Sequence, residues 1–481
     1  MDFLNVLIDK GNTLLWGYVL IYGLIALGLY FTVRSRFVQF RMFGEMIRLM
    51  TEKVTEKRDK NTKSVSSFQA FCISLASRVG TGNLAGVAIA VAVGGPGSVF
   101  WMWVIALIGS ASGFVESTLG QIYKVKDGDG FRGGPAYYIE QGLKNRHLGI
   151  FFSILVTVSY GLVLNAVQAN TITFAFEDAF GMSRILVGGV IVFITAIIIF
   201  GGVHRITKVS EKLVPVMALL YLAVVFFIVV KNIAMVPTVI GLIVSNAFGL
   251  QAALGGGIGA AVMNGIKRGL FSNEAGIGSV PNAAATADVT HPVKQGLIQA
   301  LGVFTDTLLI CSATAFVILI SGLYTNTDLN GIQLTQAAFG TQIGSWANIF
   351  LAVCIFLFAY SSIIGNYYYG ETNISFLKSN KSVLQIFRVA VIGMVAFGSV
   401  AKIDIVWNLA DLFIGLMAVT NMVGITLLSG YAFKALDNYI SQKKQGINPV
   451  FKASDIKGLE EVECWGSDEK IKVSNNMSKV L

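Results

Sequence analysis

Two groups of glycine and small polar residues interrupt stretches of the chain that are otherwise apolar. They read SRVGTGN over residues 77–83 and GLFSNEAGIGS over residues 269–279. Glycine costs roughly 1 kcal/mol relative to alanine inside a helix, so such residues favour an interruption that frees backbone groups. Free N–H groups at a helix end can bind a carboxylate, and free carbonyls can bind a small cation. We interpret both as ligand-binding breaks; the alternative is close helix packing through small residues, as expected for the glycines of 255–259.

The elements that position these breaks must be membrane-spanning helices. Hydrophobic residues make up 54% of the 481 residues, charged residues only 13%, and the mean hydropathy is +0.69. A soluble domain carries about 25% charged residues, and lipid cannot satisfy free backbone hydrogen bonds, so we expect an all-α polytopic membrane protein. About eleven runs are long enough to span: Leu14–Val33, Phe68–Gly94, Ser98–Tyr123, Gly149–Phe176, Ser183–Gly201, Leu213–Val230, Val239–Asn264, Gln295–Gly322, Ser345–Tyr369, Val383–Ala401 and Asn408–Phe433.

The two breaks occupy matching places in this series of runs. Runs two to six and runs seven to eleven each contain five helices, and each set begins with an interrupted one. Because five is odd, the two sets enter the membrane in opposite directions, which is the plan of a class of secondary transporters. The predicted organisation is an extra N-terminal helix and cytoplasmic loop (1–63), two inverted five-helix repeats (64–237 and 238–434), and a cytoplasmic tail without a core of its own (435–481).

The distribution of basic residues predicts the orientation of the chain in the membrane. With the N-terminus outside, the external segments contain only Lys10, Arg184, Lys231 and Lys402; apart from Arg78, every other Lys and Arg falls on the cytoplasmic side. This bias follows the positive-inside rule and places the C-terminus in the cytoplasm. The segment 324–344 has no basic residue and is expected to be an external loop. The first cytoplasmic loop can form an amphipathic helix at the membrane surface, with Phe37, Phe40, Phe43 and Ile47 on its apolar side.

Several function classes are disfavoured by what the chain contains. The four cysteines and three histidines have no metal-ligand spacing, and no Gly-Lys dipeptide exists for an ATP-binding P-loop. The net charge of +9 lies in loops beside apolar runs, so a lipid bilayer explains it better than nucleic acid. No enzymatic activity, organic cofactor or obligate protein partner is indicated. Arg78 lies at membrane depth, where we expect it to pair with Glu116 or Glu274.

Six motifs resemble those of a known family, the alanine or glycine:cation symporters. They are VGTGNLAGV (79–87), GGPG (94–97), FWMW (100–103), GGPAYYI (133–139), RGLFSNEAG (268–276) and HPVKQG (291–296), and the resemblance extends from about residue 10 to about 440. It implies a leucine-transporter-like fold in the plasma membrane of a bacterium or archaeon. It also implies import of a small neutral amino acid with a cation, most simply sodium. Proton coupling and a non-transporting amino-acid sensor of the same fold are the alternatives.

The resemblance implies a specific role for each of the two breaks. The substrate carboxylate is expected at the N–H groups of Thr81 and Gly82, and its ammonium at carbonyls of the second break. Gln168 and Phe174 are expected to line the pocket, and Asn165 either joins them or makes an interhelical hydrogen bond. The residues expected to contact substrate are Thr81, Gly82, Asn165, Gln168, Phe174, Phe271, Ser272, Asn273 and Asn366.

The sodium ligands expected from the resemblance are a pair of adjacent hydroxyls and two backbone carbonyls. Ser361 and Ser362 would supply the hydroxyls, and the carbonyls of Ala76 and Val79 would complete the shell; otherwise the serines bond to their own helix. Asn366 departs from the family, which often has tryptophan there. The smaller amide leaves room for a longer polar substrate, so glutamine joins alanine and glycine as a predicted substrate.

Overall fold

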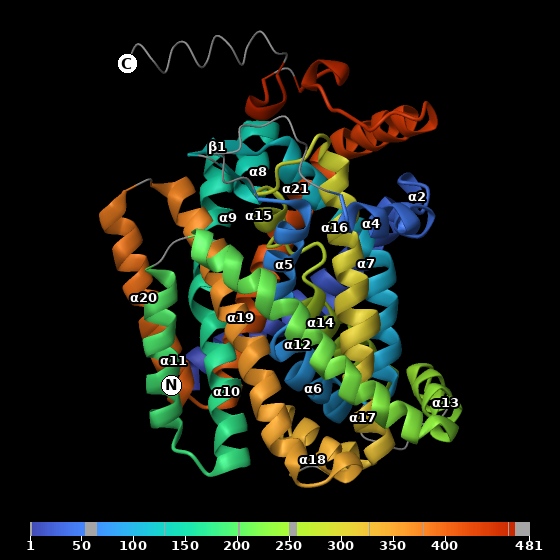
Figure 1. Ribbon diagram of the computed structural model, residues 1–481, viewed down its shortest axis with the longest axis vertical. Helices are drawn as coiled ribbons and strands as arrows, with labels where there is room; N and C mark the ends of the chain where they lie inside the picture. The colour runs from blue at the N-terminus through green and yellow to red at the C-terminus, as the bar shows by residue number, and fades with distance from the viewer. Residues whose placement is uncertain are drawn as a thin grey trace.

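The chain forms a bundle of helices that run mostly along its longest axis (Figure 1). This computed structural model describes residues 2–52, 65–128, 130–200, 203–249, 257–326, 328–378, 380–459 and 461–466. The α-helices of the first half are α1 (Asp2–Leu14), α2 (Ile21–Arg34), α3 (Val38–Arg41), α4 (Phe43–Met50), α5 (Ser67–Arg78), α6 (Val87–Gly94), α7 (Gly97–Ile122), α8 (Pro135–Leu143), α9 (Arg146–Val158), α10 (Asn165–Phe180), α11 (Arg184–Ile199) and α12 (Val203–Lys231).

The second half of the described chain is also helical and contains the longest helix, α21. Its α-helices are α13 (Val236–Ala247), α14 (Gly257–Asn273), α15 (Pro281–Ala284), α16 (Pro292–Val303), α17 (Ser312–Ser321), α18 (Gly331–Ile343), α19 (Trp346–Leu377), α20 (Lys381–Val400) and α21 (Ile403–Lys444). Between or beside them lie the π-helical segments η1 (Leu15–Leu20), η2 (Gly82–Gly86), η3 (Ser159–Leu164) and η5 (Phe304–Cys311). The strands β1 (Val125–Asp127) and β2 (Gly130–Arg132) pair antiparallel.

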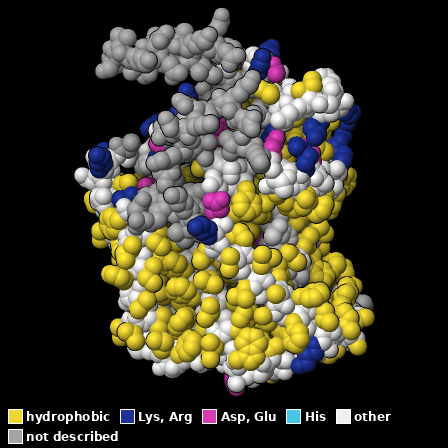
Figure 2. Space-filling view, in the orientation of Figure 1, with side chains coloured by type: hydrophobic (Ala, Val, Ile, Leu, Met, Phe, Trp, Pro, Cys, Tyr) yellow, Lys and Arg dark blue, Asp and Glu magenta, His cyan; other side chains and the backbone are white. Residues whose placement is uncertain are grey.

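The lengths and apolar composition of the helices indicate a membrane protein. Among the described residues, eight helices are long and apolar enough to cross a bilayer, and the bent pair Ser67–Arg78 and Gly82–Gly94 makes a ninth. The helices Arg184–Ile199 and Ile233–Ala247 are apolar but shorter. Figure 2 shows hydrophobic side chains over the body of the molecule, and most of the visible Lys and Arg side chains toward the end that carries the C-terminal segment. This distribution suits a helix bundle embedded in lipid.

Two sequence expectations need correction. The run Val239–Asn264 is not one helix, because α13 ends at Ala247 and α14 begins only at Gly257. Gly249 and Gly257, which flank the intervening sequence, both have positive φ, a conformation in which helices commonly end. The segment 324–344 is not a simple loop, because it contains the 13-residue helix α18.

The C-terminal segment packs on the body of the protein, although the sequence suggested a tail without a core of its own. Helix α21 continues to Lys444, and the Phe451 N–H beyond it donates to the Thr290 carbonyl at 2.9 Å. The buried Trp465 donates its Nε1–H to the Gln121 carbonyl at 2.9 Å. This end of the molecule is therefore closed by a segment that follows the last helix.

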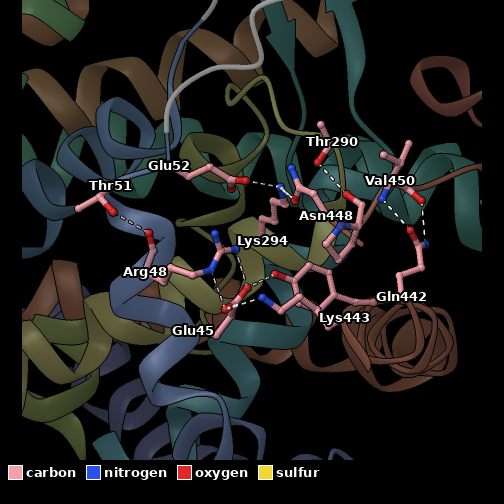
Figure 3. Close-up of polar contacts among 12 residues, drawn as sticks. Glu45, Arg48, Thr51, Glu52, Thr290, Lys294, Gln442, Lys443, Asn448 and Val450 are labelled. Carbon is pink, nitrogen blue, oxygen red and sulfur yellow. Dashed lines mark hydrogen bonds and ion pairs between the residues drawn. The ribbon is translucent and has the colours of Figure 1, made fainter. Parts of the chain in front are cut away.

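A charged cluster between α4 and α21 anchors the N-terminal part to this end (Figure 3). Glu45 accepts hydrogen bonds from Arg48 (2.7 and 2.8 Å), Tyr439 (2.5 Å) and Lys443 (3.1 Å). Burial alone would raise the pKa of Glu45, but these hydrogen bonds outweigh it and lower the pKa to about 2, from an ordinary 4.5. The carboxylate therefore stays charged at any physiological pH.

We expect Glu45→Gln to unfold at a lower temperature than the wild type at neutral pH. The folded-state pKa is lowered, so the stabilisation by Glu45 is present above about pH 4.5 and is lost as the pH falls toward about 2. The difference between the two unfolding temperatures should therefore shrink on acidification. Thermal unfolding in detergent across this range measures it, and a difference independent of pH would contradict the assignment.

Candidate functional site

The first break separates α5 from the π-helical segment η2. Helix α5 starts with a capping box, in which Ser66 and Gln69 each satisfy the other's backbone N–H. It ends at Arg78, and the Gly80 N–H donates to the Asn83 side chain at 3.0 Å in place of a helix carbonyl. The two halves of the span are bent by 51°. Buried backbone is thus released from helical bonding near the middle of the span, as the sequence predicted.

The second break follows α14 directly. The helix ends at Asn273, and Glu274 takes a left-handed backbone conformation (φ 58°), which is uncommon for a residue with a side chain. Hydroxyls of Ser77 (2.9 Å) and Ser279 (2.6 Å) donate to the Glu274 carboxylate. The freed Gly276 N–H donates to Glu116 at 3.1 Å. Side chains therefore replace helical hydrogen bonds through this break.

The two breaks touch each other. A Cβ added to Gly82 would lie 3.1 Å from the Ser272 Cα and 3.2 Å from the Phe271 ring. Such distances are tighter than ordinary van der Waals contact, so a side chain at position 82 would have to displace its neighbours on α14. The broken spans therefore form one buried site rather than two.

Gly82→Ala should reduce the maximal uptake rate several-fold, because the methyl group pushes the breaks apart where they meet. Gly393→Ala is the matched control, since a Cβ on that helical glycine meets nothing within 4 Å. Initial uptake rates of both variants, normalised to the amount of folded protein, measure the effect. Equal rates for Gly82→Ala and wild type would show that the close approach is not needed.

Hydroxyl and carbonyl oxygens meet at the end of α5. The Ser362 hydroxyl on α19 lies 2.9 Å from the Ala76 carbonyl oxygen and 3.4 Å from that of Val79. The Ser361 hydroxyl lies 3.4 Å from the same Ala76 oxygen. Both serines also donate to the Phe358 carbonyl of their own helix, at 2.8 Å and 3.1 Å. The four residues predicted as sodium ligands are therefore gathered, with two of them also bonded within their helix.

Three other residues predicted to bind substrate come from α10. Gln168 reaches the first break, where its Oε1 accepts the Thr81 N–H at 3.1 Å. Asn165 donates to the Gly161 carbonyl of the preceding turn at 2.9 Å, and its Oδ1 is buried with no hydrogen-bond partner among the described residues. The ring of Phe174 lies 3.9 Å below the Arg184 guanidinium, near the end of the helix. Only Gln168 of these three contacts a break through a hydrogen bond.

Asp306 is a buried carboxylate that connects both breaks, and it is absent from the site residues predicted from the sequence. From the π-helical segment η5, it accepts hydrogen bonds from Asn83 of the first break (2.7 Å) and Ser272 of the second (2.8 Å). Thr307 donates to it as well, at 2.9 Å, and accepts from Asn273 at 3.1 Å. The signal that could have indicated it is a lone aspartate inside the apolar run Gln295–Gly322.

Asn366 lies one helical turn beyond Ser362 and contacts Ser77 at the end of α5. Its Oδ1 lies 2.9 Å from the Ser77 hydroxyl, which is also 2.9 Å from Glu274. The other polar atom of this amide is buried and has no hydrogen-bond partner among the described residues. A buried amide atom left without a partner is uncommon, and it is available to a polar group of a ligand.

The expected pairing of Arg78 with Glu116 or Glu274 does not occur. Among the described residues, Arg78 makes no ion pair within 4 Å, and its Nη1 donates to the Gln299 carbonyl at 3.1 Å. The buried ion pair near the site is instead Arg268 with Asp411, in a two-pronged contact of 3.1 and 2.7 Å. Phe271 stacks on Trp407 with ring centroids 4.7 Å apart, next to this guanidinium.

Comparison with known proteins gives consistent matches over nearly the whole chain. The sequence model of the sodium:alanine symporter family matches residues 1–453. The probable sodium/glutamine symporter GlnT of Bacillus subtilis is 54% identical over 475 residues, 98% of this chain and 99% of that protein. The sodium/alanine symporter AgcS of Methanococcus maripaludis is 37% identical, covering 89% of this chain and 96% of that protein.

Solved structures show the same architecture at much lower sequence similarity. A manganese transporter of Eremococcus coleocola superposes with a TM-score of 0.51 at 13% identity, covering 89% of this chain and 94% of that chain. At this identity the likeness concerns the fold alone.

Proposed function

Because the chain belongs to the sodium:alanine symporter family, a family of transporters and not of enzymes, we propose that it imports a small neutral amino acid together with sodium by alternating access. The observation that carries this proposal is the meeting of Ser361 and Ser362 with the carbonyls of Ala76 and Val79 at a break. Sodium prefers hydroxyl and carbonyl oxygens, and a broken helix supplies such carbonyls at membrane depth.

The energetics suit a coupled carrier. One sodium ion moving inward through 100 mV yields about 2.3 kcal/mol, and each tenfold sodium gradient adds about 1.4 kcal/mol. Together these support amino-acid accumulation on the order of several hundred-fold without ATP. The breaks are the elements whose movement would expose the site to one side and then to the other.

The free backbone groups of the two breaks favour one orientation of the bound amino acid. Its carboxylate would take the N–H groups near Thr81 and Gly82, displacing the Gln168 oxygen that now accepts one of them. Its ammonium would face the carbonyls of Phe271, Ser272 and Asn273 at the C-terminal end of α14. Asn165 and Phe174 remain proposed pocket residues, with less direct support from their present contacts.

Glutamine is the proposed preferred substrate. The free polar atom of the Asn366 amide could form a hydrogen bond with the side-chain amide of glutamine, a group that alanine and glycine lack. A relative that is 54% identical is named a probable sodium/glutamine symporter, which points the same way.

Asn366→Trp should lower glutamine uptake several-fold while leaving glycine uptake in the same protein nearly unchanged. The indole fills the space for a longer side chain and removes the free amide. The ratio of glutamine to glycine uptake is therefore the measurement, with glycine as the internal control for folding. Asn366→Ala removes the amide without adding bulk and should also lower the ratio. An unchanged ratio in both variants would refute the role of Asn366.

We place the protein in the plasma membrane with the N-terminus outside and the C-terminus in the cytoplasm. The positive-inside bias supports this orientation, and so does the gathering of Lys and Arg toward one end (Figure 2). We also propose that the first helix precedes two inverted five-helix repeats, 64–237 and 238–434, each led by a broken span.

Reconstituted protein tests the proposal and its alternatives together. Liposomes containing the protein would be given labelled alanine, glycine or glutamine with either a sodium or a proton gradient. We expect uptake to follow the sodium gradient. Uptake driven by protons alone would favour a proton-coupled symporter. Saturable binding without uptake or counterflow would favour an amino-acid sensor.

A further inference from the structure

A basic pocket lies outside the transport site, where the end of α2 meets α21. Its volume is about 200 Å³, and Arg34, Arg36 and Lys434 line it together with Tyr30, Phe433 and Asp437. Phe433 is buried, whereas Tyr30 is 47% exposed at the rim. The pocket thus combines three cations with an aromatic surface that continues toward the helix bundle.

The cations of this pocket are not neutralised as their neighbours are. In the adjacent cluster of Figure 3, Arg48 and Lys443 pair with Glu45, and Lys294 pairs with Glu52 at 2.7 Å. Within the described part of the chain, by contrast, no ion pair or hydrogen bond is formed by the side chains of Arg34, Arg36 or Lys434. Arg34 and Lys434 only approach aromatic rings, at 5.9 and 5.7 Å. One acid, Asp437, offsets three cations, so the pocket attracts an anion.

The pocket stands at the border of the apolar surface. Arg34 is the last residue of the apolar span Ile8–Arg34, and Leu29 and Val33 on the same helix are 48% and 64% exposed. Beyond the end of α2, Phe37 and Phe40 are about half exposed, Phe37 just before the short helix α3 and Phe40 on it. A phospholipid has an anionic headgroup and apolar acyl chains. A cationic pocket flanked by exposed apolar side chains is complementary to both parts.

We propose that this pocket binds the phosphodiester headgroup of an anionic phospholipid, with the acyl chains against Tyr30 and the exposed face of α2. Guanidinium and ammonium groups recognise phosphate oxygens through charge-assisted hydrogen bonds. A basic pocket between helices at the cytoplasmic membrane border is a favourable site for such a lipid. The proposal needs the membrane location of the protein but not its substrate or coupling ion, so either can fail without the other.

Native mass spectrometry of delipidated full-length protein titrated with phosphatidylglycerol tests this site. The variant Arg34→Gln/Arg36→Gln/Lys434→Gln removes the three cations. The control Lys444→Gln/Lys452→Gln/Lys457→Gln removes the same charge from exposed lysines of the same end that do not line the pocket. Because all six side chains are exposed, both variants should unfold at the wild-type temperature.

We expect the wild type and the control to bind phosphatidylglycerol in preference to phosphatidylcholine. The pocket variant should bind it on the order of a hundred-fold more weakly, at roughly five-fold per cation. Equal affinity of the pocket variant and the control would overturn the site. Displacement of the lipid by equimolar inorganic phosphate or glycerol 3-phosphate would show that a soluble anion is bound instead, and would overturn the lipid assignment.

Discussion

Ser362→Ala is expected to raise the sodium concentration for half-maximal uptake by about ten-fold to a hundred-fold. The hydroxyl is held 2.9 Å from the Ala76 carbonyl and 3.4 Å from that of Val79, so it is part of the oxygen cluster proposed for sodium. Losing one such contact to a charged group removes about 1.5–3 kcal/mol. At saturating sodium the rate should recover toward that of the wild type, because the substrate contacts remain.

Ser375→Ala is the control for this experiment. Ser375 lies on the same helix, α19, but its hydroxyl donates to the Glu371 carbonyl of its own helix at 2.9 Å. We expect its sodium dependence to match the wild type. A wild-type sodium dependence in Ser362→Ala as well would remove the serine from the ion site.

Asp411→Asn is expected to destabilise the folded protein by about 3–5 kcal/mol, because it leaves buried cations without their counter-charge. Asp411 is 1% exposed and binds Arg268 at 2.7 Å and Lys267 at 2.5 Å. Arg268 is itself buried beside Trp407 and precedes the second break by one turn. The variant should therefore also disturb the stack of Phe271 on Trp407.

Thermal and denaturant unfolding in detergent measure this loss. Asp404→Asn provides the comparison, since Asp404 is an exposed residue in the first turn of the same helix. It should change the unfolding free energy by less than about 0.5 kcal/mol. If the two variants had the same stability, the buried ion pair would not be holding α14 against α21.

The sequence predicted the main features of the site because glycine and polar residues are conspicuous in apolar runs. The interruptions at Gly80 and just after Asn273 occur where expected, and the family resemblance is confirmed. Ser362 also meets Ala76, although almost 290 residues separate them in the chain. Local composition and a known family pattern were sufficient for these features.

Other features depend on packing that one sequence does not reveal. The helix of 331–343 has only 13 residues, so its sequence lacks the long apolar run that indicates a membrane span. Asp306 is an ordinary aspartate until the fold brings Asn83 and Ser272 to it from separate helices. Arg78 and Arg268 are both buried arginines near a break, but only the position of Asp411 on a distant helix decides which one has a carboxylate partner.

The structure of the protein bound to sodium and glutamine tests the shared site between the breaks most directly. We predict the amino-acid carboxylate within hydrogen-bond distance of the N–H groups of Thr81 and Gly82. The ion should be coordinated by the carbonyls of Ala76 and Val79 and the hydroxyls of Ser361 and Ser362. Glutamine or sodium bound elsewhere, with continuous helical hydrogen bonding through Gly80 and Asn273, would contradict the account.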